Sequence, residues 1–146
     1  MSANLIPILW EATLQTIYMV VVSGLIGTVL GLPLGVFLAT SKRGELLSAP
    51  AVNAALGLVV NALRSIPFII LVVAIIPFTR MIAGTSIGTT AAIVPLTLAA
   101  APFIARIVET AIREVDGGLI EAARAMGATP GQIITKVLLP EALPGI

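Results

Sequence analysis

Residues 12–40 read ATLQTIYMVVVSGLIGTVLGLPLGVFLAT and decide the fold, because this stretch contains no Asp, Glu, Lys or Arg. The part from Ile17 to Thr40 would form a helix about 36 Å long, at a rise of about 1.5 Å per residue. The hydrocarbon core of a bilayer is about 30 Å thick, so such a helix crosses it with some tilt. We therefore expect the first membrane span over residues 12–40.

Two further apolar regions follow this span. Residues 55–79 are interrupted only by Arg64, residues 81–105 contain no charged residue, and Arg80 alone separates the two regions. Charged residues make up only 10% of the chain, whereas a water-soluble domain carries about 25%. The sequence thus predicts an all-α, polytopic integral membrane protein with three transmembrane helices, in which residues 1–146 belong to a single membrane domain.

The composition excludes most enzymatic and nucleic-acid-binding functions. The sequence contains no cysteine and no histidine, which excludes disulfides, thiolate or imidazole metal sites, and Ser-His or Cys-His nucleophiles. A formal net charge of +1 provides no basic field for nucleic acid. The chain also lacks a G-x-x-x-x-G-K-[ST] phosphate loop. We expect no catalytic, metal or cofactor site and no nucleic-acid partner.

The positions of Lys and Arg predict how the spans are oriented. Arg80 lies between the second and third spans, and the basic residues at the opposite ends of the spans are more numerous. They are Lys42, Arg43, Arg106, Arg113, Arg124 and Lys136. Because Lys and Arg accumulate on the cytoplasmic side of membrane proteins, we expect the N-terminus outside the cell and the C-terminal segment in the cytoplasm.

Small residues recur every four positions in the first span, at Ser23, Gly27, Gly31 and Gly35. This spacing places them along one face of a helix. In lipid, small residues let a neighbouring helix approach closely, and close packing takes the place of the hydrophobic driving force. We expect this face to pack against another helix.

Arg64 is the one charge inside an apolar region. At the centre of a bilayer an arginine costs roughly 2.5–3.5 kcal/mol on insertion scales. We therefore expect Arg64 near the cytoplasmic end of its helix or facing the protein interior. Two interpretations remain open: the side chain reaches the membrane interface as an anchor, or it lines the cytoplasmic mouth of a pathway.

After the third span the sequence becomes amphipathic, with charged residues among the apolar ones. The helix is expected to continue past Arg106, with Glu109 and Arg113 as a favourable i, i+4 pair. Asp116 then caps a short helix over residues 119–126. Gly127 is expected to stop that helix with a positive φ.

A second short helix begins at Thr129. Thr129, Pro130 and Gln132 have the spacing of a hydroxyl N-cap, a proline at the first helical position and a reciprocal N3 side chain. Two sets of apolar residues are expected to share faces of the two helices: Leu119, Ile120, Ala123 and Met126, and Ile133, Ile134, Val137 and Leu138. Residues 116–140 therefore form a compact cytoplasmic unit suited to insertion into a groove on another protein.

A longer pattern runs through this unit. Glu121, Ala122 and Ala123 are followed by Gly127 after three residues, and Leu139 and Pro140 come later in the chain. The spacing resembles the EAA-x3-G-x9-I-x-LP signature of ABC importer permeases, with Val137 where Ile is usual. The second and third apolar regions resemble the methionine uptake family of such permeases. The matching stretches are Arg64 to Leu71, Ile76 to Arg80, Gly84 to Gly88 and Ala101 to Arg106.

The resemblance implies a permease subunit of an ATP-driven importer in the bacterial inner membrane. Its expected partners are a second copy of the permease, an ABC ATP-binding subunit that binds the ATP, a substrate-binding lipoprotein or periplasmic protein, and membrane lipid. The expected substrate is methionine, in both L and D forms. The resemblance assigns coupling to the ATPase to Glu121, Ala122, Ala123, Gly127, Leu139 and Pro140.

Permeases of the methionine family normally have five spans, and three are expected here. We therefore expect a chain truncated at its C-terminus, with a naturally short subunit as the alternative. Two other functions remain open: a permease for another amino acid, and a membrane scaffold that docks a cytoplasmic protein without a transport pathway. A permease should co-purify with an ATP-binding subunit, whereas a scaffold should be indifferent to nucleotide.

Overall fold

The computed structural model describes residues 2–41 and 46–146. Lys42 and Arg43, which contribute to the predicted orientation, lie outside the described residues. Every element described is helical, which confirms the all-α prediction. In chain order these are α1 (Ser2–Thr40), α2 (Pro50–Ser65), α3 (Phe68–Ala74), α4 (Ile76–Ala83), α5 (Thr89–Arg113), α6 (Gly117–Ala125), α7 (Pro130–Ile133), a π-helix η1 (Ile134–Leu138), α8 (Leu139–Ala142) and a 3₁₀ turn η2 (Leu143–Gly145).

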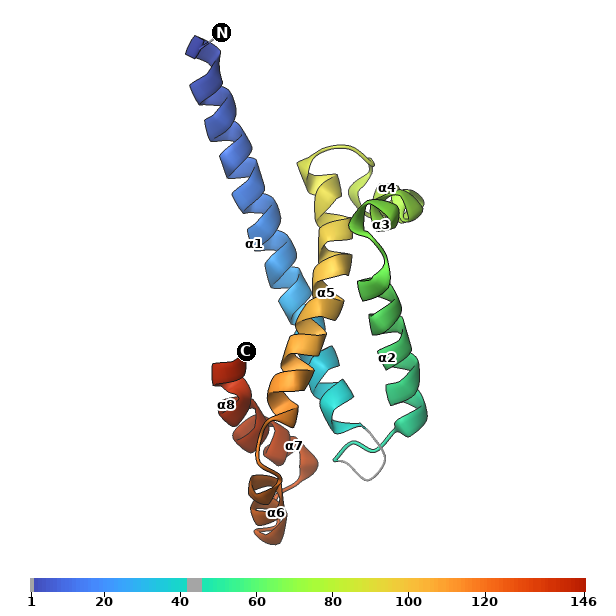
Figure 1. The fold of residues 1–146 in the computed structure, drawn as a ribbon, viewed down its shortest axis with the longest axis vertical. Helices are drawn as coiled ribbons and strands as arrows, with labels where there is room; N and C mark the ends of the chain where they lie inside the picture. Colours follow the sequence, from blue (N-terminus) through green and yellow to red (C-terminus); the bar gives the residue numbers. More distant parts are fainter. Residues whose placement is uncertain (1, 42–45) are drawn as a thin grey trace.

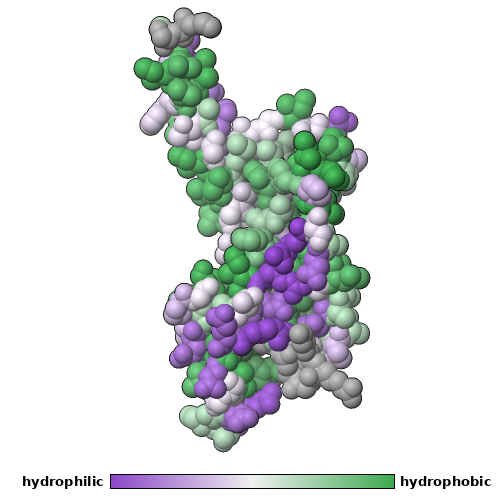
Figure 2. Space-filling view, viewed as in Figure 1, coloured by the Kyte–Doolittle hydropathy of each residue, from purple (hydrophilic) through white to green (hydrophobic). Residues whose placement is uncertain are grey.

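Two helices of the described chain, α1 and α5, are long and apolar enough to cross a membrane. They lie against each other over the lower half of α1, and α2 lies beside α5 (Figure 1). The N-terminal part of α1 extends beyond the other helices (Figure 1) and exposes large apolar side chains such as Ile6 and Trp10. Figure 2 shows this largely hydrophobic upper region, and it shows that the hydrophilic residues of this face gather in the lower half, between hydrophobic ones. The apolar surface is what a membrane environment requires.

The predicted stripe of small residues is the surface on which α5 packs. A Cβ atom added at Gly31 would lie 2.7 Å from the carbonyl oxygen of Ala101, and one at Gly35 would lie 2.5 Å from that of Ala105. Both distances are shorter than real Cβ atoms tolerate. Only glycine therefore allows the two helix backbones to approach this closely, and the expected packing face is confirmed.

The second apolar region is not one straight helix, in contrast to the single span predicted over residues 55–79. Pro67 forces Ile66 into an extended conformation, with φ −78° and ψ 127°, because a residue before proline avoids the helical region. Helices α2 and α3 consequently meet at an angle of 108°. The pair counts as a third span only if this bent arrangement crosses the membrane as one unit.

The third apolar region also differs from the predicted bounds of 81–105. Arg80 lies inside α4, and the turn follows it at residues 84–88. Gly84 and Gly88 have φ values of 79° and 109°, which L side chains rarely adopt, so the chain turns there and α5 begins at Thr89. The positions of the membrane boundaries along these helices remain a prediction.

The largest buried apolar cluster lies where the lower ends of α1 and α5 meet the C-terminal helices. Residues 117–145 wrap around this end of α5 (Figure 1). The buried members of the cluster are Ala39, Val108, Ala111, Ile112, Ala123, Ile133, Ile134, Leu138 and Ala142. This packing holds residues 116–140 at the end of the molecule opposite the N-terminus (Figure 1).

Candidate functional site

The first short helix of residues 116–140 begins as the sequence predicts. The amide of Gly118 donates a hydrogen bond to the Asp116 carboxylate at 3.0 Å, so Asp116 caps α6. Ala123 is buried against the apolar cluster, whereas Glu121 and Ala122 are exposed. Helix α6 is thus anchored by its small inner face and presents the first two residues of the EAA signature outward.

Gly127 ends α6 with a φ of 82°, which confirms the expected positive value. Its amide donates to the carbonyl of Arg124 at 3.0 Å, and the amide of Ala128 donates to that of Ala123 at 3.1 Å. These two bonds form a Schellman motif, which satisfies carbonyl groups at the helix end. A Cβ atom at Gly127 would meet nothing within 4 Å, so the backbone conformation, and not the available space, requires glycine.

The predicted capping box starts the second short helix. The Thr129 hydroxyl accepts from the Gln132 amide at 3.3 Å, and the Gln132 side chain accepts from the Thr129 amide at 2.9 Å. Both bonds are present, so the helix start inferred from residues 129–132 is confirmed. The turn between the two helices is therefore specified by backbone geometry on one side and by side-chain caps on the other.

This second helix widens into a π turn that the sequence analysis did not anticipate. The amide of Leu139 donates to the carbonyl of Ile134, one residue further back than in an α-helix. Pro140 follows directly, and a proline has no amide to donate and crowds the carbonyl four residues earlier, here that of Lys136. The Leu139-Pro140 pair of the signature thus coincides with the change of helix register. Leu139 is half-buried and Pro140 is exposed.

The predicted apolar faces of the two short helices differ in burial. Ile133 and Leu138 are each 1% exposed and pack into the core. Leu119 and Met126 were expected to share a face with Ala123, but they are exposed, and Met126 is 86% exposed at the end of α6. A fully exposed methionine beside a rigid turn is the kind of projection that inserts into an apolar groove of a partner.

The charged side chains of α6, Glu121 and Arg124, are exposed and border a groove. The Glu121 carboxylate makes no hydrogen bond or ion pair, with Arg124 or any other residue, within the part of the chain that the structure describes. A groove of about 350 Å³ separates α6 from the end of α1. Its lining includes Thr40, Arg113, Glu121 and Arg124.

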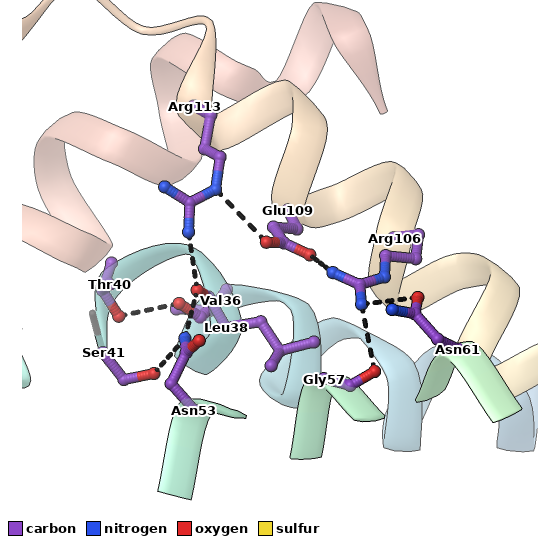
Figure 3. Close-up of polar contacts among 10 residues, drawn as sticks. All are labelled: Val36, Leu38, Thr40, Ser41, Asn53, Gly57, Asn61, Arg106, Glu109 and Arg113. Atoms are coloured by element: carbon purple, nitrogen blue, oxygen red, sulfur yellow. Dashed lines mark hydrogen bonds and ion pairs between the residues drawn. The ribbon is translucent and has the colours of Figure 1, made fainter. Parts of the chain in front are cut away.

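A polar network joins the end of α1 to α2 and to the C-terminal half of α5 (Figure 3). The Glu109 carboxylate pairs with Arg106 and, at 3.2 Å, with Arg113, which confirms the predicted i, i+4 pair. The sequence analysis missed two asparagines of α2, Asn53 and Asn61, that join this network. No local pattern identifies them, since their partners lie on other helices.

Arg64 lies in the last turn of α2, at the end of the helix away from residues 42–45. The break at Pro67 ends α2 beside the middle of α5, and the position of Arg64 relative to the membrane stays a prediction. Arg64 is exposed and borders two cavities of about 340 and 470 Å³, both of which reach Phe103.

Within residues 2–41 and 46–146, no three His, Cys, Asp or Glu side chains group as a metal site requires.

The sequence of this chain is similar to those of proteins named as transport permeases. It is 61% identical to the probable D-methionine transport system permease protein MetI of Vibrio cholerae over 95% of this chain and 62% of the relative. It is 56% identical to the D-methionine transport system permease protein MetI of Escherichia coli K12, over 96% of this chain and 66% of the relative. The chain thus spans about two thirds of the length of these relatives.

The fold is similar to solved structures of the same group. An inward-facing crystal form of the MetNI methionine ABC transporter matches with a TM-score of 0.91 and 56% identity, over 95% of this chain and 66% of that one. The crystal structure of an amino acid ABC transporter with histidines, at 23% identity and a TM-score of 0.62, shares the fold. Residues 31–146 match the family described as the binding-protein-dependent transport system inner membrane component. The chain belongs to this family of inner-membrane transport components.

Proposed function

We propose that this chain is the membrane-spanning permease subunit of an ATP-driven importer of methionine, and that residues 116–140 couple it to a separate ATP-binding subunit. The observation that carries the proposal is the geometry of the EAA segment. Two capped short helices are anchored through Ala123, Ile133 and Leu138, and their turn projects Met126 outward. Such a rigid projection can transmit a push from a docked protein into the core around α1 and α5.

The coupling residues divide into two groups under this proposal. Glu121 and Ala122 are exposed and would contact the ATP-binding subunit. The others set the shape of the segment: Ala123 by its small buried side chain, Gly127 by its positive φ, and Leu139 and Pro140 by the π turn. ATP binding and hydrolysis would reside in the partner, so the chain itself is not an enzyme and holds no cofactor.

The proposed substrate is methionine in its L and D forms. The relatives at 56–61% identity are named for D-methionine transport, which supports this choice. A permease for another amino acid is the alternative. The further partners proposed are a second copy of the chain, a substrate-binding lipoprotein or periplasmic protein, and membrane lipid.

The proposed orientation has the N-terminus outside and residues 116–140 in the cytoplasm. The N-terminus and α6 lie at opposite ends of the molecule (Figure 1), which supports their location on opposite sides of a membrane. We propose Arg64 as a residue of the translocation pathway, since it borders two cavities beside α5. Its position at the far end of α2 favours a site deeper in the membrane over the cytoplasmic mouth.

Uptake in sealed vesicles tests the function directly. The permease, an ATP-binding subunit and a substrate-binding protein are co-expressed, and entry of labelled L-methionine is measured with and without ATP. The proposal predicts ATP-dependent entry that excess D-methionine reduces. Preferential inhibition by a different amino acid would instead identify that amino acid as the substrate. Entry that is independent of ATP, together with no retention of the ATP-binding subunit, would support the scaffold alternative.

A further inference from the structure

Glu109 and its partners connect three helices that the coupling segment has to move. We infer that Asn53, Asn61, Arg106, Glu109 and Arg113, together with the carbonyls of Leu38 and Gly57, form a polar clamp that makes α1, α2 and α5 move as one body with the coupling segment. These are positioning residues, and the inference rests on the proposed coupling function.

The centre of the clamp is a buried carboxylate between two arginines (Figure 3). The side chain of Glu109 is only 10% exposed, and its two oxygens pair with Arg106 on one side and Arg113 on the other. A charge buried to this extent is strongly unfavourable when one of its partners is removed. The three side chains therefore hold one another in a single arrangement on α5.

The clamp reaches α2 through Arg106. Its guanidinium donates to the side-chain oxygen of Asn61 at 2.7 Å and to the carbonyl of Gly57 at 3.2 Å. Most side chains of α2 are exposed, and Val60 is its buried residue. With so little apolar packing of its own, α2 depends on these hydrogen bonds for a defined position relative to α5.

The clamp reaches the end of α1 through Arg113. Leu38 lies in the last turn of α1, where carbonyl groups have no partner within the helix. Its carbonyl accepts from Arg113 at 3.0 Å and from the Asn53 side chain at 2.8 Å. The last turn of α1 contains no basic residue, so the positive charge that favours a helix C-terminus is supplied by α5.

The clamp also adjoins the coupling segment. Arg113 is the last residue of α5, and only two residues separate it from Asp116, which caps α6. Arg113 lines the same groove as Glu121 and Arg124. A displacement of α6 is therefore applied to the end of α5 that holds the clamp, and the clamp passes it on to α1 and α2.

The test compares Glu109→Gln with Glu114→Gln in the complete transporter, reconstituted with its ATP-binding and substrate-binding proteins. Glu114 follows the last residue of α5 and is exposed, and within the described residues its side chain makes no hydrogen bond or ion pair. We expect Glu109→Gln to retain the ATP-binding subunit but to import about 5-fold less substrate per ATP hydrolysed, the lower end of typical coupling effects. Glu114→Gln is expected to match the wild type.

A second variant and a distance measurement separate coupling from folding. Asn53→Ala removes the bonds to the Leu38 carbonyl and to the Ser41 hydroxyl without leaving a buried charge, and should lower the same ratio. The chain has no cysteine, so Val52→Cys and Thr110→Cys provide a clean pair for spin labels on α2 and α5. Their separation should be the same with and without nucleotide in the wild type and should change with nucleotide in Glu109→Gln.

The outcomes distinguish this inference from the proposed function. An unchanged ratio of import to ATP hydrolysis in both Glu109→Gln and Asn53→Ala would overturn the clamp, as would a wild-type label separation that changes with nucleotide. A wild-type chain that neither retains an ATP-binding subunit nor imports substrate would contradict the proposed function instead. In that case the label separation in Glu109→Gln still reports whether these residues hold α2 against α5.

Discussion

Two regions of the molecule depend on glycine for opposite reasons. Where α1 packs on α5, Gly35 has an ordinary helical backbone but no room for a side chain, because a Cβ atom would lie 2.5 Å from the Ala105 carbonyl. In the coupling segment, Gly127 has open space around it but a φ of 82°. The first glycine permits close approach of two spans, and the second permits a turn. The same substitution should therefore separate helices in one region and strain a single turn in the other.

The largest effect of a substitution on the free energy of unfolding is expected at the contact between α1 and α5. Gly35→Ala places a methyl group against the backbone carbonyl of Ala105 and against Val108, neither of which can move without shifting α5. Overpacking of this kind costs about 3 kcal/mol of unfolding free energy. The measurement is the unfolding free energy of the purified protein in detergent.

Gly24→Ala is the matched control on the same helix. A Cβ atom at Gly24 meets nothing within 4 Å, so this variant should be as stable as the wild type or slightly more so. Equal losses for Gly35→Ala and Gly24→Ala would show that the closeness of α5 does not account for the effect, because the gain in helix propensity from Gly to Ala can only stabilise both variants.

A smaller loss of stability is expected when a helix cap of the coupling segment is removed. Thr129→Ala removes the hydroxyl that accepts from the Gln132 amide, and loss of such a cap costs about 1 kcal/mol. The loss is local, so amide hydrogen exchange should accelerate at residues 131–134 and remain unchanged in α5. Thr135→Ala is the control, because the Thr135 hydroxyl donates only to the Gly131 carbonyl and plays no part in the box. Similar exchange in both variants would contradict the role of the cap.

The smallest effect on stability is expected at Glu121. Its carboxylate is exposed and makes no hydrogen bond or ion pair among the described residues, so Glu121→Lys should change the unfolding free energy by less than about 0.5 kcal/mol. Binding of the ATP-binding subunit, measured by titration in detergent, should nevertheless weaken. Glu141→Lys makes the same change of charge on the exposed surface of α8. If both variants bind equally well, Glu121 does not belong to the docking surface.

The features that were predictable from sequence are those with local causes. The cap at Asp116, the positive φ at Gly127 and the box of Thr129 and Gln132 each depend on residues within three positions of one another. The regular spacing of Gly27, Gly31 and Gly35 likewise identifies a packing face, because helix periodicity alone places them together.

The structural features that the sequence did not predict have one of two causes. They depend on contacts between helices, or on a proline whose backbone restrictions conflict with the apolar pattern of the same segment. Hydropathy alone places residues 55–79 in one span, whereas the conformation imposed by Pro67 divides it. The π turn reflects a missing amide at Pro140, which a count of apolar positions does not register. Asn53 and Asn61 acquire their roles only through Arg106 and Leu38, so no pattern in α2 reveals them.

The central claim is that the turn at Gly127 shapes the surface that docks the ATP-binding subunit. Gly127→Val places a β-branched side chain at a φ of 82°, at a cost of about 1–3 kcal/mol. Gly131→Val is the matched control, since Gly131 is also exposed and unobstructed but lies in the helical turn of α7 without a positive φ.

The deciding measurement is the amount of ATP-binding subunit that co-purifies with each variant, relative to the amount of permease in the membrane. The account predicts normal membrane levels for both variants, retention of the ATP-binding subunit by Gly131→Val, and at least about a 5-fold loss of retention by Gly127→Val. Wild-type retention by Gly127→Val at a normal membrane level would contradict the coupling role of this turn.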